Sequence, residues 1–522
     1  MRLAYGLVFV ALISACGSTR PMARGPVLVA APVQPELVVM VVVDQLPVRL
    51  YDRVKPWFTG GMARFTSPDA FQAVGHYAYA RTLTCPGHAT LSTGAAPSTS
   101  GIPANAWSAD GHMVYCADAT FLRAEPLADV VHAHGGKVAS LSIKDRAAVM
   151  MGGHSADAIV WMDLKTLHFT GGTDPSSVAT IAALDEAVPL ATYAAQPWNA
   201  LRPDLYAGAF PDAQPFELGP GGIGQTFPHP APTGTAADGA PVVTAQAFRA
   251  EPSSGDALAD AAIAVVDVLK LGDDATPDLL AVSFSDTDYI GHAFTPDSWE
   301  AMDGLLRLDQ ALGRLFAALD AKVGAGRWSV VLTSDHGCAG GTGVRIRPGD
   351  VESRANAGLA SAGFEAKVEL EDGAVFLPAS AKVDDATRRK AEAAVIASVS
   401  TLTGVVGAYA WGEPDGVPDS APNAEAIRLS YAPGRSGDVL VVPADGAMFD
   451  SPEHDGMGTG HGTPYGYDTR VPVVAWGVGV RPGAAGADVD TRRVAPTLAA
   501  LLGVPAPAQA TLPPIEELLA RP

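Results

Sequence analysis

The sequence predicts an α/β protein with a doubly wound, mostly parallel sheet and an inserted subdomain. Three observations lead to this expectation. Short apolar runs rich in β-branched residues recur along the 522-residue chain, and such runs are typical of strands buried on both faces of a parallel sheet. Stretches with helical periodicity lie between them, so strand and helix alternate. Several of the runs end in Asp or His, at the place where open α/β sheets bind ligands.

Five apolar runs are assigned to strands. They cover residues 37–43, 137–143, 279–284, 328–333 and 471–476. The first run is LVVMVVV and ends at Asp44, the third leads into SDTDYIGH, and the fourth leads into SDHG. Because the carboxyl ends of parallel strands lie at one edge of a sheet, we expect the polar residues that follow these runs to converge there.

Two helices are predicted between the strands. Residues 299–319 place leucine at one face, at positions 305, 308, 312, 315 and 319, which is the spacing of an amphipathic helix. A second helix is expected over residues 255–271, which are rich in Ala, Val and Leu.

Two stretches interrupt this alternation. Residues 197–243 are dense in Pro and Gly and predict a long surface excursion. Residues 345–445 contain a strand-like segment at 374–377 and a helical one at 386–399. Because loops longer than about 15 residues are uncommon, we interpret this second stretch as an inserted subdomain.

Composition limits the classes of function. Hydrophobic residues make up 48% and charged residues 17% of the chain, which excludes a disordered or fibrous protein. The formal net charge is −21, from 35 basic and 56 acidic side chains. This balance argues against nucleic acid as a specific partner and against docking on anionic lipid.

The N-terminus predicts export. Arg2 precedes an uncharged, mostly apolar stretch at residues 3–13, which suits a secretory signal and is too short to span a membrane. ISAC then resembles a lipobox ending at Cys16, so we expect a lipoprotein signal peptide over residues 1–16 and a flexible tether over 17–35. The alternative is an ordinary signal peptide cleaved near Ala15. Either interpretation places the protein outside the cytoplasm, as a periplasmic or outer-membrane-anchored lipoprotein in the first case.

Three further cysteines are Cys85, Cys116 and Cys338. An exported chain lies in an oxidising compartment, which favours a disulfide between Cys85 and Cys116 with Cys338 free. The sequence alone leaves the pairing open.

The residues after the strands have the chemistry of metal ligands. Asp44, Asp288, His292, Asp335 and His336 belong to three separate segments, and Asp and His are suitable ligands for zinc. Each has another interpretation alone, since an Asp after a strand often caps a helix and a single histidine is often a core or surface residue. Their joint occurrence after several strands favours a metal site.

Thr84 is the candidate nucleophile. In RTLTCPGH, Pro86 can open a helix, which would place Thr84 near its positive N-terminal end. A threonine hydroxyl reacts poorly at neutral pH unless a metal lowers its pKa. A capping role in a turn is the alternative for this residue.

Seven motifs in order resemble the alkaline phosphatase superfamily. They are VVVDQ, TLTCPGHATLSTG, GIPANAW, SIKDRAAVMMGG, DTDYIGH, SDHG and GHGTPYGYDTRVPVVAWG. The chain is most similar to the monomeric bacterial alkaline phosphatases with a threonine nucleophile, which are relatives of the nucleotide pyrophosphatase/phosphodiesterases. The resemblance runs from about residue 36 to 502 and implies one catalytic domain over residues 36–520, with insertions at about 197–243 and 345–445.

The resemblance also implies a role for each matching residue. Asp288, His292 and His461 match the ligands of one Zn²⁺, and Asp44, Asp335 and His336 match those of a second. His454 lies near His461 but outside the GHGTPY motif. Thr84 matches the nucleophile, Asn105 matches a side chain that binds a phosphoryl oxygen, and Lys144 and Arg146 match a pair that contacts the remaining phosphate oxygens. Arg470 stands where many relatives have histidine, at a position that is not a ligand.

We therefore expect an exported, zinc-dependent phosphate monoester hydrolase, an alkaline phosphatase that acts through a phosphothreonine on small phosphorylated substrates. The expected protein is a monomer with two Zn²⁺, and the resemblance leaves room for a structural Ca²⁺ to which we assign no residue. The alternative is a phosphodiesterase or nucleotide pyrophosphatase, which should lack the Lys144–Arg146 pair. A sulfatase is disfavoured, because sulfatases need a C-x-P-x-R segment to form their formylglycine nucleophile and here Pro86 directly follows Cys85. A non-catalytic binding module of a surface lipoprotein is a remote alternative. Such a module is expected to lack metal ligands, and all six matching residues are present.

Overall fold

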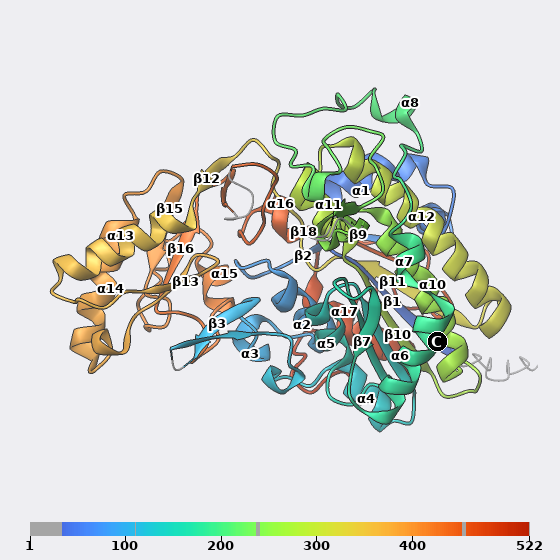
Figure 1. Ribbon diagram of the computed structural model, residues 1–522. Helices are drawn as coiled ribbons and strands as arrows, with labels where there is room; N and C mark the ends of the chain where they lie inside the picture. Colours follow the sequence, from blue (N-terminus) through green and yellow to red (C-terminus); the bar gives the residue numbers. More distant parts are fainter. Residues whose placement is uncertain (1–33, 110, 236–240, 451–455, 521–522) are drawn as a thin grey trace, which may run out of the picture.

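A large twisted sheet forms the centre of the molecule (Figure 1). The computed structural model describes residues 34–109, 111–235, 241–450 and 456–520. Within these residues the sheet has ten strands in the order β19-β2-β18-β11-β1-β10-β5-β6-β7, with β20 beside β2. Their bounds are β1 Leu37–Val43, β2 Phe71–His76, β5 Val138–Ser142, β6 Ala158–Asp163, β7 His168–Gly171, β10 Asp278–Phe284, β11 Trp328–Thr333, β18 Arg470–Gly477, β19 Gly483–Ala484 and β20 Val489–Asp490.

The prediction of an α/β fold with a mostly parallel sheet is confirmed. Strands β11, β1, β10, β5 and β6 run parallel to one another. All five predicted strands are present, with ends that differ from the predicted ones by no more than one residue. Strand β18 runs antiparallel to β11 and to β2. Its apolar run therefore reflects burial on both faces of the sheet. Such burial does not require parallel pairing.

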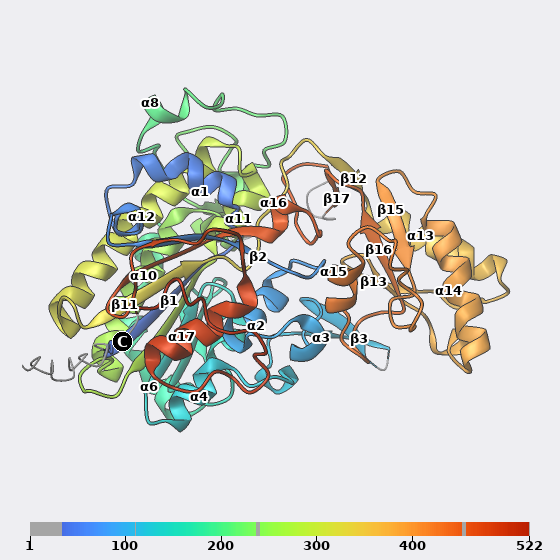
Figure 2. The same ribbon diagram turned by 180° about the vertical axis from the view of Figure 1, so that it is seen from behind.

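Helices cover both faces of the sheet (Figure 2). Alternate residues of β1 point to opposite sides, so Val39 and Val41 belong to one hydrophobic core and Val38 and Met40 to the other. The first core contains residues of α6 Pro175–Ala187, α10 Pro252–Leu269, α11 Asp286–Phe294 and α12 Trp299–Leu319. The second contains residues of α2 Thr84–Thr93, α4 Leu127–Ala133, α5 Asp145–Gly152 and α17 Val494–Leu502. The helix predicted at 299–319 is α12, and the one predicted at 255–271 corresponds to α10.

Residues 348–443 form a lobe beside the main sheet, on the left in Figure 1. Its four antiparallel strands are in the order β13-β14-β16-β15. The bounds of this lobe's elements are α13 Pro348–Ser361, β13 Glu369–Glu371, β14 Ala374–Phe376, α14 Asp385–Val399, β15 Val405–Tyr409, α15 Ala424–Leu429 and β16 Val439–Pro443. One face of this small sheet packs on α13 and α14. Its other face packs against the segments that contain Cys85 and Trp107, so the lobe is docked next to the start of α2.

Residues 197–235 cross the surface above α12, with the short helix α8 Pro203–Tyr206 at their outermost part (Figure 1). Trp198 and Tyr206 both donate hydrogen bonds to the buried carboxylate of Asp303 in α12, at 2.6 and 2.9 Å. The excursion is therefore anchored to the main core by polar contacts.

The expected signal peptide, its Cys16, residues 17–33 of the tether and His454 lie outside the described residues. Among the helices of the described part, none is both long and apolar enough to cross a membrane.

Candidate active site

Three ligand-type side chains converge at the carboxyl ends of β1 and β11. Asp44 directly follows β1, and Asp335 and His336 follow β11 after one intervening residue. These two strands are adjacent and parallel, so their ends meet. Asp44, Asp335 and His336 are fully buried, and each offers a ligand atom within 4.8 Å of the others.

A second group lies beside the first. Asp288 and His292 are four residues apart in α11, which follows β10, and therefore share one helix face. His461 comes from the loop before α16 Gly466–Thr469. Ligand atoms of Asp288, His292 and His461 also lie within 4.8 Å of one another. The structure thus brings all six predicted metal ligands together as the two predicted triads.

Hydrogen bonds from the Nδ1 atoms of three histidines orient their rings in the two triads. Nδ1 of His292, His336 and His461 donates to the backbone carbonyls of Thr459, Gly337 and Thr82, at 2.8, 2.9 and 2.8 Å. A carbonyl can only accept, so each Nδ1 carries a proton, and in a neutral ring Nε2 is then the nitrogen with the lone pair. Metal-binding histidines are oriented by bonds of this kind.

In the first triad, buried acceptor atoms face one another without a donor. Asp44 Oδ1, Asp335 Oδ2 and His336 Nε2 have no hydrogen-bond partner. His336 Nε2 lies 3.3 Å from Asp335 Oδ2 and 3.7 Å from Asp44 Oδ1. Three converging acceptors are costly to bury unless a cation lies between them. The donor set of two carboxylates and one imidazole fits Zn²⁺.

The two triads are close enough to act as one centre. The rings of His336 and His461 stack with 3.7 Å between centroids. The ammonium of Lys144 contacts Asp44 Oδ2 at 2.8 Å and Asp288 Oδ2 at 2.5 Å, joining one carboxylate of each triad. Lys144 is itself buried. A positive side chain therefore bridges the two triads.

The pKa values of the carboxyl groups differ with their neighbours. Burial raises the pKa of Asp44 well above its ordinary value, and the charge of Asp335 adds to the increase. Burial also acts to raise the pKa of Asp288, but the Lys144 ammonium and His292 outweigh it and hold that pKa well below its ordinary value. Burial lowers the pKa of His336, which keeps its imidazole neutral and available as a ligand.

Thr84 is the first residue of α2. Its side chain is almost fully buried yet lines the pocket next to the second triad. The positive end of a ten-residue helix stabilises negative charge on an oxygen at this position. A Cβ atom on Gly87 would lie 2.4 Å from the backbone oxygen of Asp335, so only glycine lets α2 approach the first triad this closely.

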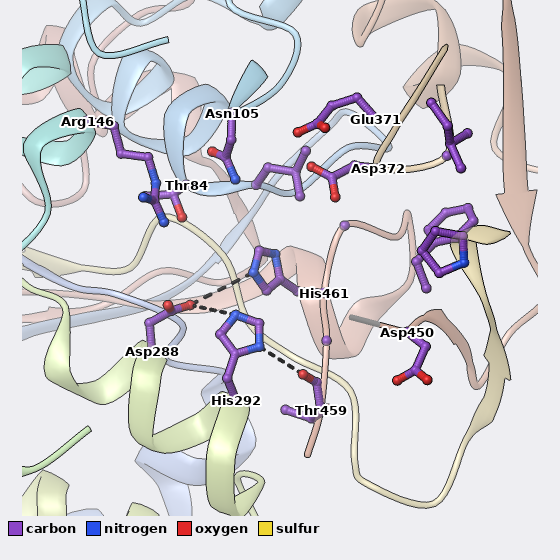
Figure 3. A pocket seen from close by; sticks show the side chains of 17 residues that line it. Thr84, Asn105, Arg146, Asp288, His292, Glu371, Asp372, Asp450, Thr459 and His461 are labelled. Carbon is purple, nitrogen blue, oxygen red and sulfur yellow. Dashed lines mark hydrogen bonds and ion pairs between the residues drawn. The ribbon is translucent and has the colours of Figure 1, made fainter. Parts of the chain in front are cut away.

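Two of the three predicted phosphate-binding residues, Asn105 and Arg146, lie near Thr84 in the pocket (Figure 3). Asn105 and Arg146 line the same pocket as Thr84, Asp288 and His461. Asn105 Oδ1 accepts a hydrogen bond from the backbone of Cys85 at 3.0 Å, which turns its amide NH₂ group away from the helix. Lys144 uses two of its three N–H donors on carboxylates, so one donor remains.

Cys85 and Cys116 form a disulfide, and Cys338 is free and buried. The disulfide joins the start of α2 to the hairpin of β3 Ala106–Ala109 and β4 His112–Tyr115. The backbone of Cys116 also donates to the carbonyl of Asn105 at 2.9 Å. The bond therefore connects the segment of Thr84, the predicted nucleophile, with that of Asn105, a predicted phosphate-binding residue.

Three residues at this site were not predicted from the sequence. Gln45 Nε2 donates to Asp288 Oδ1 at 2.9 Å, and Gln45 adopts φ +62. His88, one turn after Thr84, donates from Nδ1 to the Thr84 carbonyl at 2.9 Å and lies 3.3 Å from Asp335 Oδ2. The hydroxyl of Tyr115 accepts from Arg146 at 3.2 Å and donates to Asp145 at 2.7 Å.

Two of these three residues could have been found in the sequence. Gln45 and His88 lie within the VVVDQ and TLTCPGHATLSTG motifs, so their positions were a usable signal. Tyr115 had none.

We expect the Tyr115→Phe substitution to lower kcat/KM for a phosphate monoester by about three- to tenfold, because it removes one hydrogen bond that orients the Arg146 guanidinium. Steady-state assays with p-nitrophenyl phosphate measure this effect. In an Arg146→Ala background the same substitution should change kcat/KM by less than about twofold, since the group that it positions is gone. An equal loss in both backgrounds would contradict a role for Tyr115 through Arg146.

The chain was compared with known proteins. Residues 38–468 match the model of the type I phosphodiesterase / nucleotide pyrophosphatase family. The chain is 30% identical to the alkaline phosphatase PhoK of a Sphingomonas species, over 91% of this chain and 89% of PhoK. It is 29% identical to the alkaline phosphatase PafA of Elizabethkingia meningoseptica, over 94% of this chain and 95% of PafA.

A solved structure agrees with these similarities. The crystal structure of wild-type alkaline phosphatase PafA superposes with a TM-score of 0.80 at 26% identity, covering 94% of this chain and all of PafA. The matched segment includes Asp44, Thr84, Asp288, Asp335 and His461. The chain therefore belongs to the type I phosphodiesterase / nucleotide pyrophosphatase family of the alkaline phosphatase superfamily.

Proposed function

We propose that this protein is an exported, zinc-dependent alkaline phosphatase, which hydrolyses small phosphate monoesters through a phosphothreonine on Thr84. The similarity to named alkaline phosphatases supports a phosphoester hydrolase. The observation that carries the finer proposal is the position of Thr84, Lys144 and Arg146 around two triads of metal-ligand type.

The residues of the chain divide the work on the phosphoryl group. Thr84 Oγ1 gives up its proton to water and attacks phosphorus, and the leaving oxygen departs on the opposite side and takes a proton from water. Asn105, Arg146 and the remaining N–H donor of Lys144 bind the other phosphoryl oxygens and offset the charge that they carry in the transition state. Water then releases phosphate from the phosphothreonine and restores the hydroxyl.

Two metal ions would complete this site. Asp44, Asp335 and His336 would hold one, and Asp288, His292 and His461 the other. When bound, they supply Lewis acidity, which lowers the pKa of the Thr84 hydroxyl and offsets negative charge on the leaving oxygen. We infer zinc because each donor set combines carboxylate with imidazole.

Preference for a monoester over a diester follows from Lys144 and Arg146. A monoester dianion presents one more charged oxygen than a diester, whose second substituent occupies that position. Two cationic side chains at that place stabilise the extra charge and have no equivalent partner on a diester. A phosphodiesterase remains the second candidate, because the same family includes it.

The combined substitution Lys144→Ala with Arg146→Ala tests this preference. We expect kcat/KM for p-nitrophenyl phosphate to fall by about 10³-fold, because two charge-assisted contacts to the phosphoryl group are lost. We expect kcat/KM for bis-p-nitrophenyl phosphate to fall by less than about tenfold. Both values come from steady-state assays on purified, zinc-loaded protein.

Zinc content of the variant, measured in parallel, serves as the control, since Lys144 also contacts Asp44 and Asp288. A variant with two zinc ions that loses both activities equally would contradict the role assigned to this pair. Higher activity of the parent on the diester than on the monoester would favour the second candidate.

Export through a lipid-modified Cys16 is part of the proposal. It is supported by Arg2 and the apolar stretch at residues 3–13, which precede the ISAC segment. The Cys85–Cys116 disulfide is in keeping with an oxidising compartment.

A further inference from the structure

The pocket in front of Thr84 has a second wall, to which the proposed reaction assigns no role. The cavity has a volume of about 350 Å³. Thr84, Asn105 and Arg146 line one side, and Glu371 and Asp372 line another (Figure 3). These two carboxylates lie at the turn between β13 and β14, so they come from the lobe and not from the main sheet.

Neither carboxylate forms a direct ion pair with another described residue, although the charge of Arg81 acts on both of them and that of Arg146 acts on Asp372. Within the described residues, the side chains of Glu371 and Asp372 have no hydrogen-bond or ion-pair partner. The nearby carboxylate of Asp450 differs, because it accepts from Arg345 at 3.1 Å and from the backbone of Gly456 at 3.0 Å. Partial burial, together with the charge of Asp372, raises the pKa of Glu371 to about 7. A cation beside this pair would relieve that repulsion.

The distance between the two walls is held by a buried arginine. The guanidinium of Arg81 donates to the backbone carbonyls of Glu371 and Asp372, at 3.0 and 3.2 Å, and to that of Pro103 at 3.1 Å. Arg81 lies three residues before Thr84 in the sequence. The acidic turn is therefore tied directly to the segment of the nucleophile, and its side chains remain free to face the pocket.

The pocket is consequently bipolar. Lys144 and Arg146 provide positive charge at the end where the phosphoryl group would bind, and Glu371 and Asp372 provide negative charge at the other side. Leu370 and Phe449 also line the cavity and add apolar surface to it. This arrangement is complementary to a molecule with a phosphate at one end and a cation at the other.

We propose that Glu371 and Asp372 recognise the leaving group, favouring phosphate monoesters that carry an ammonium and disfavouring those that carry a further anion. The inference rests on the proposed monoesterase function and adds a substrate class to it. In such a substrate, the ammonium lies beside the two carboxylates while Thr84 attacks phosphorus. A nucleoside polyphosphate or a carboxylated phosphate ester would place negative charge against the same wall.

Three substrates of equal length test the proposal. They are 2-aminoethyl phosphate, propyl phosphate and carboxymethyl phosphate, which are cationic, neutral and anionic at the leaving group. The test variant combines Glu371→Gln with Asp372→Asn. It preserves both backbone carbonyls that Arg81 binds, and asparagine tolerates the φ of +44 at position 372.

In the variant we expect the ratio of kcat/KM for 2-aminoethyl phosphate to that for propyl phosphate to fall by about five- to tenfold, since two partly solvated charge interactions are lost. Activity on propyl phosphate should stay within about twofold of the parent, and activity on carboxymethyl phosphate should rise. Raising the ionic strength should weaken the parent's preference for the amino substrate.

Glu365→Gln is the matched control. This exposed glutamate lies in the same lobe, before β13, and does not line the pocket; its removal should leave the three ratios unchanged. An unchanged amino-to-propyl ratio in the double variant would overturn the inference, as would an equal loss on all three substrates. If the parent enzyme hydrolyses all three substrates alike, this inference is wrong and the proposed monoesterase function stands. A parent that hydrolyses none of them overturns the proposed function and this inference with it.

Discussion

Replacing Thr84 with alanine is expected to lower kcat for phosphate monoesters by about 10⁴-fold or more, because the substitution removes the atom that attacks phosphorus in the proposed mechanism. Thr84 is the first residue of α2 and lines the pocket beside Asp288 and His461. The triads, Lys144 and Arg146 are untouched by the change, so substrate and metal binding should persist. The measurement is kcat with p-nitrophenyl phosphate together with acid-quench mass spectrometry of the Thr84 peptide.

The acid quench gives a readout that a general loss of structure would not produce. The parent enzyme should yield a phosphopeptide that contains Thr84, and the alanine variant should yield none. Thr84→Ser keeps a hydroxyl at the same position and should recover most of the activity and a phosphoserine peptide. If phosphate appeared on another residue, or if Thr84→Ala remained active, Thr84 would not be the nucleophile.

The second large effect is expected from removal of the charge of Asp335, one of the proposed metal ligands. Asp335 Oδ1 accepts from the backbone of Gln45 and His336, at 3.1 and 3.0 Å, while its Oδ2 faces Asp44 and His336 without a hydrogen bond. Asp335→Asn can keep the first set of contacts and loses the charge that would bind the metal. We expect kcat/KM to fall by about 10³-fold and the zinc content to fall from two ions per chain to about one.

Metal analysis by plasma mass spectrometry and steady-state assays measure these changes. A chelator should abolish the activity of the parent, and added Zn²⁺ should restore it, whereas the variant should recover little. Asp273→Asn, at an exposed carboxylate away from the site, serves as the control and should keep both zinc ions and full activity. Full activity of the chelated parent would contradict a metal-dependent mechanism.

Much of the fold was predictable because its strands are strongly marked. The run at residues 37–43 has no polar residue, and β1 has the same bounds in the structure. Helix α12 was predicted at its observed bounds because its leucines repeat at helical spacing over several turns. The orientation of β18 was not predictable, since parallel and antiparallel strands that are buried on both faces have the same apolar pattern.

Five of the six candidate ligands could be found in the sequence because they follow apolar runs that mark the ends of strands. Asp44 and Asp335 each follow an apolar run, and parallel neighbours bring such ends together. His461 is different, because it lies in a loop and was assigned through the family resemblance alone. The contacts that orient these ligands depend on the folded chain, as with the carbonyl of Thr82, which holds His461 from 379 residues away.

By itself, then, the sequence determined the α/β architecture, the strand ends with their acidic and histidine residues, and the resemblance to the alkaline phosphatase superfamily. These features depend on local composition and on order along the chain. Only the tertiary structure decided which groups face one another across the site. Tyr115 beside Arg146, and the unpaired Glu371 and Asp372 opposite Thr84, are pairings of segments far apart in sequence. No local pattern records them, because the packing of the lobe and the hairpin against α2 creates them.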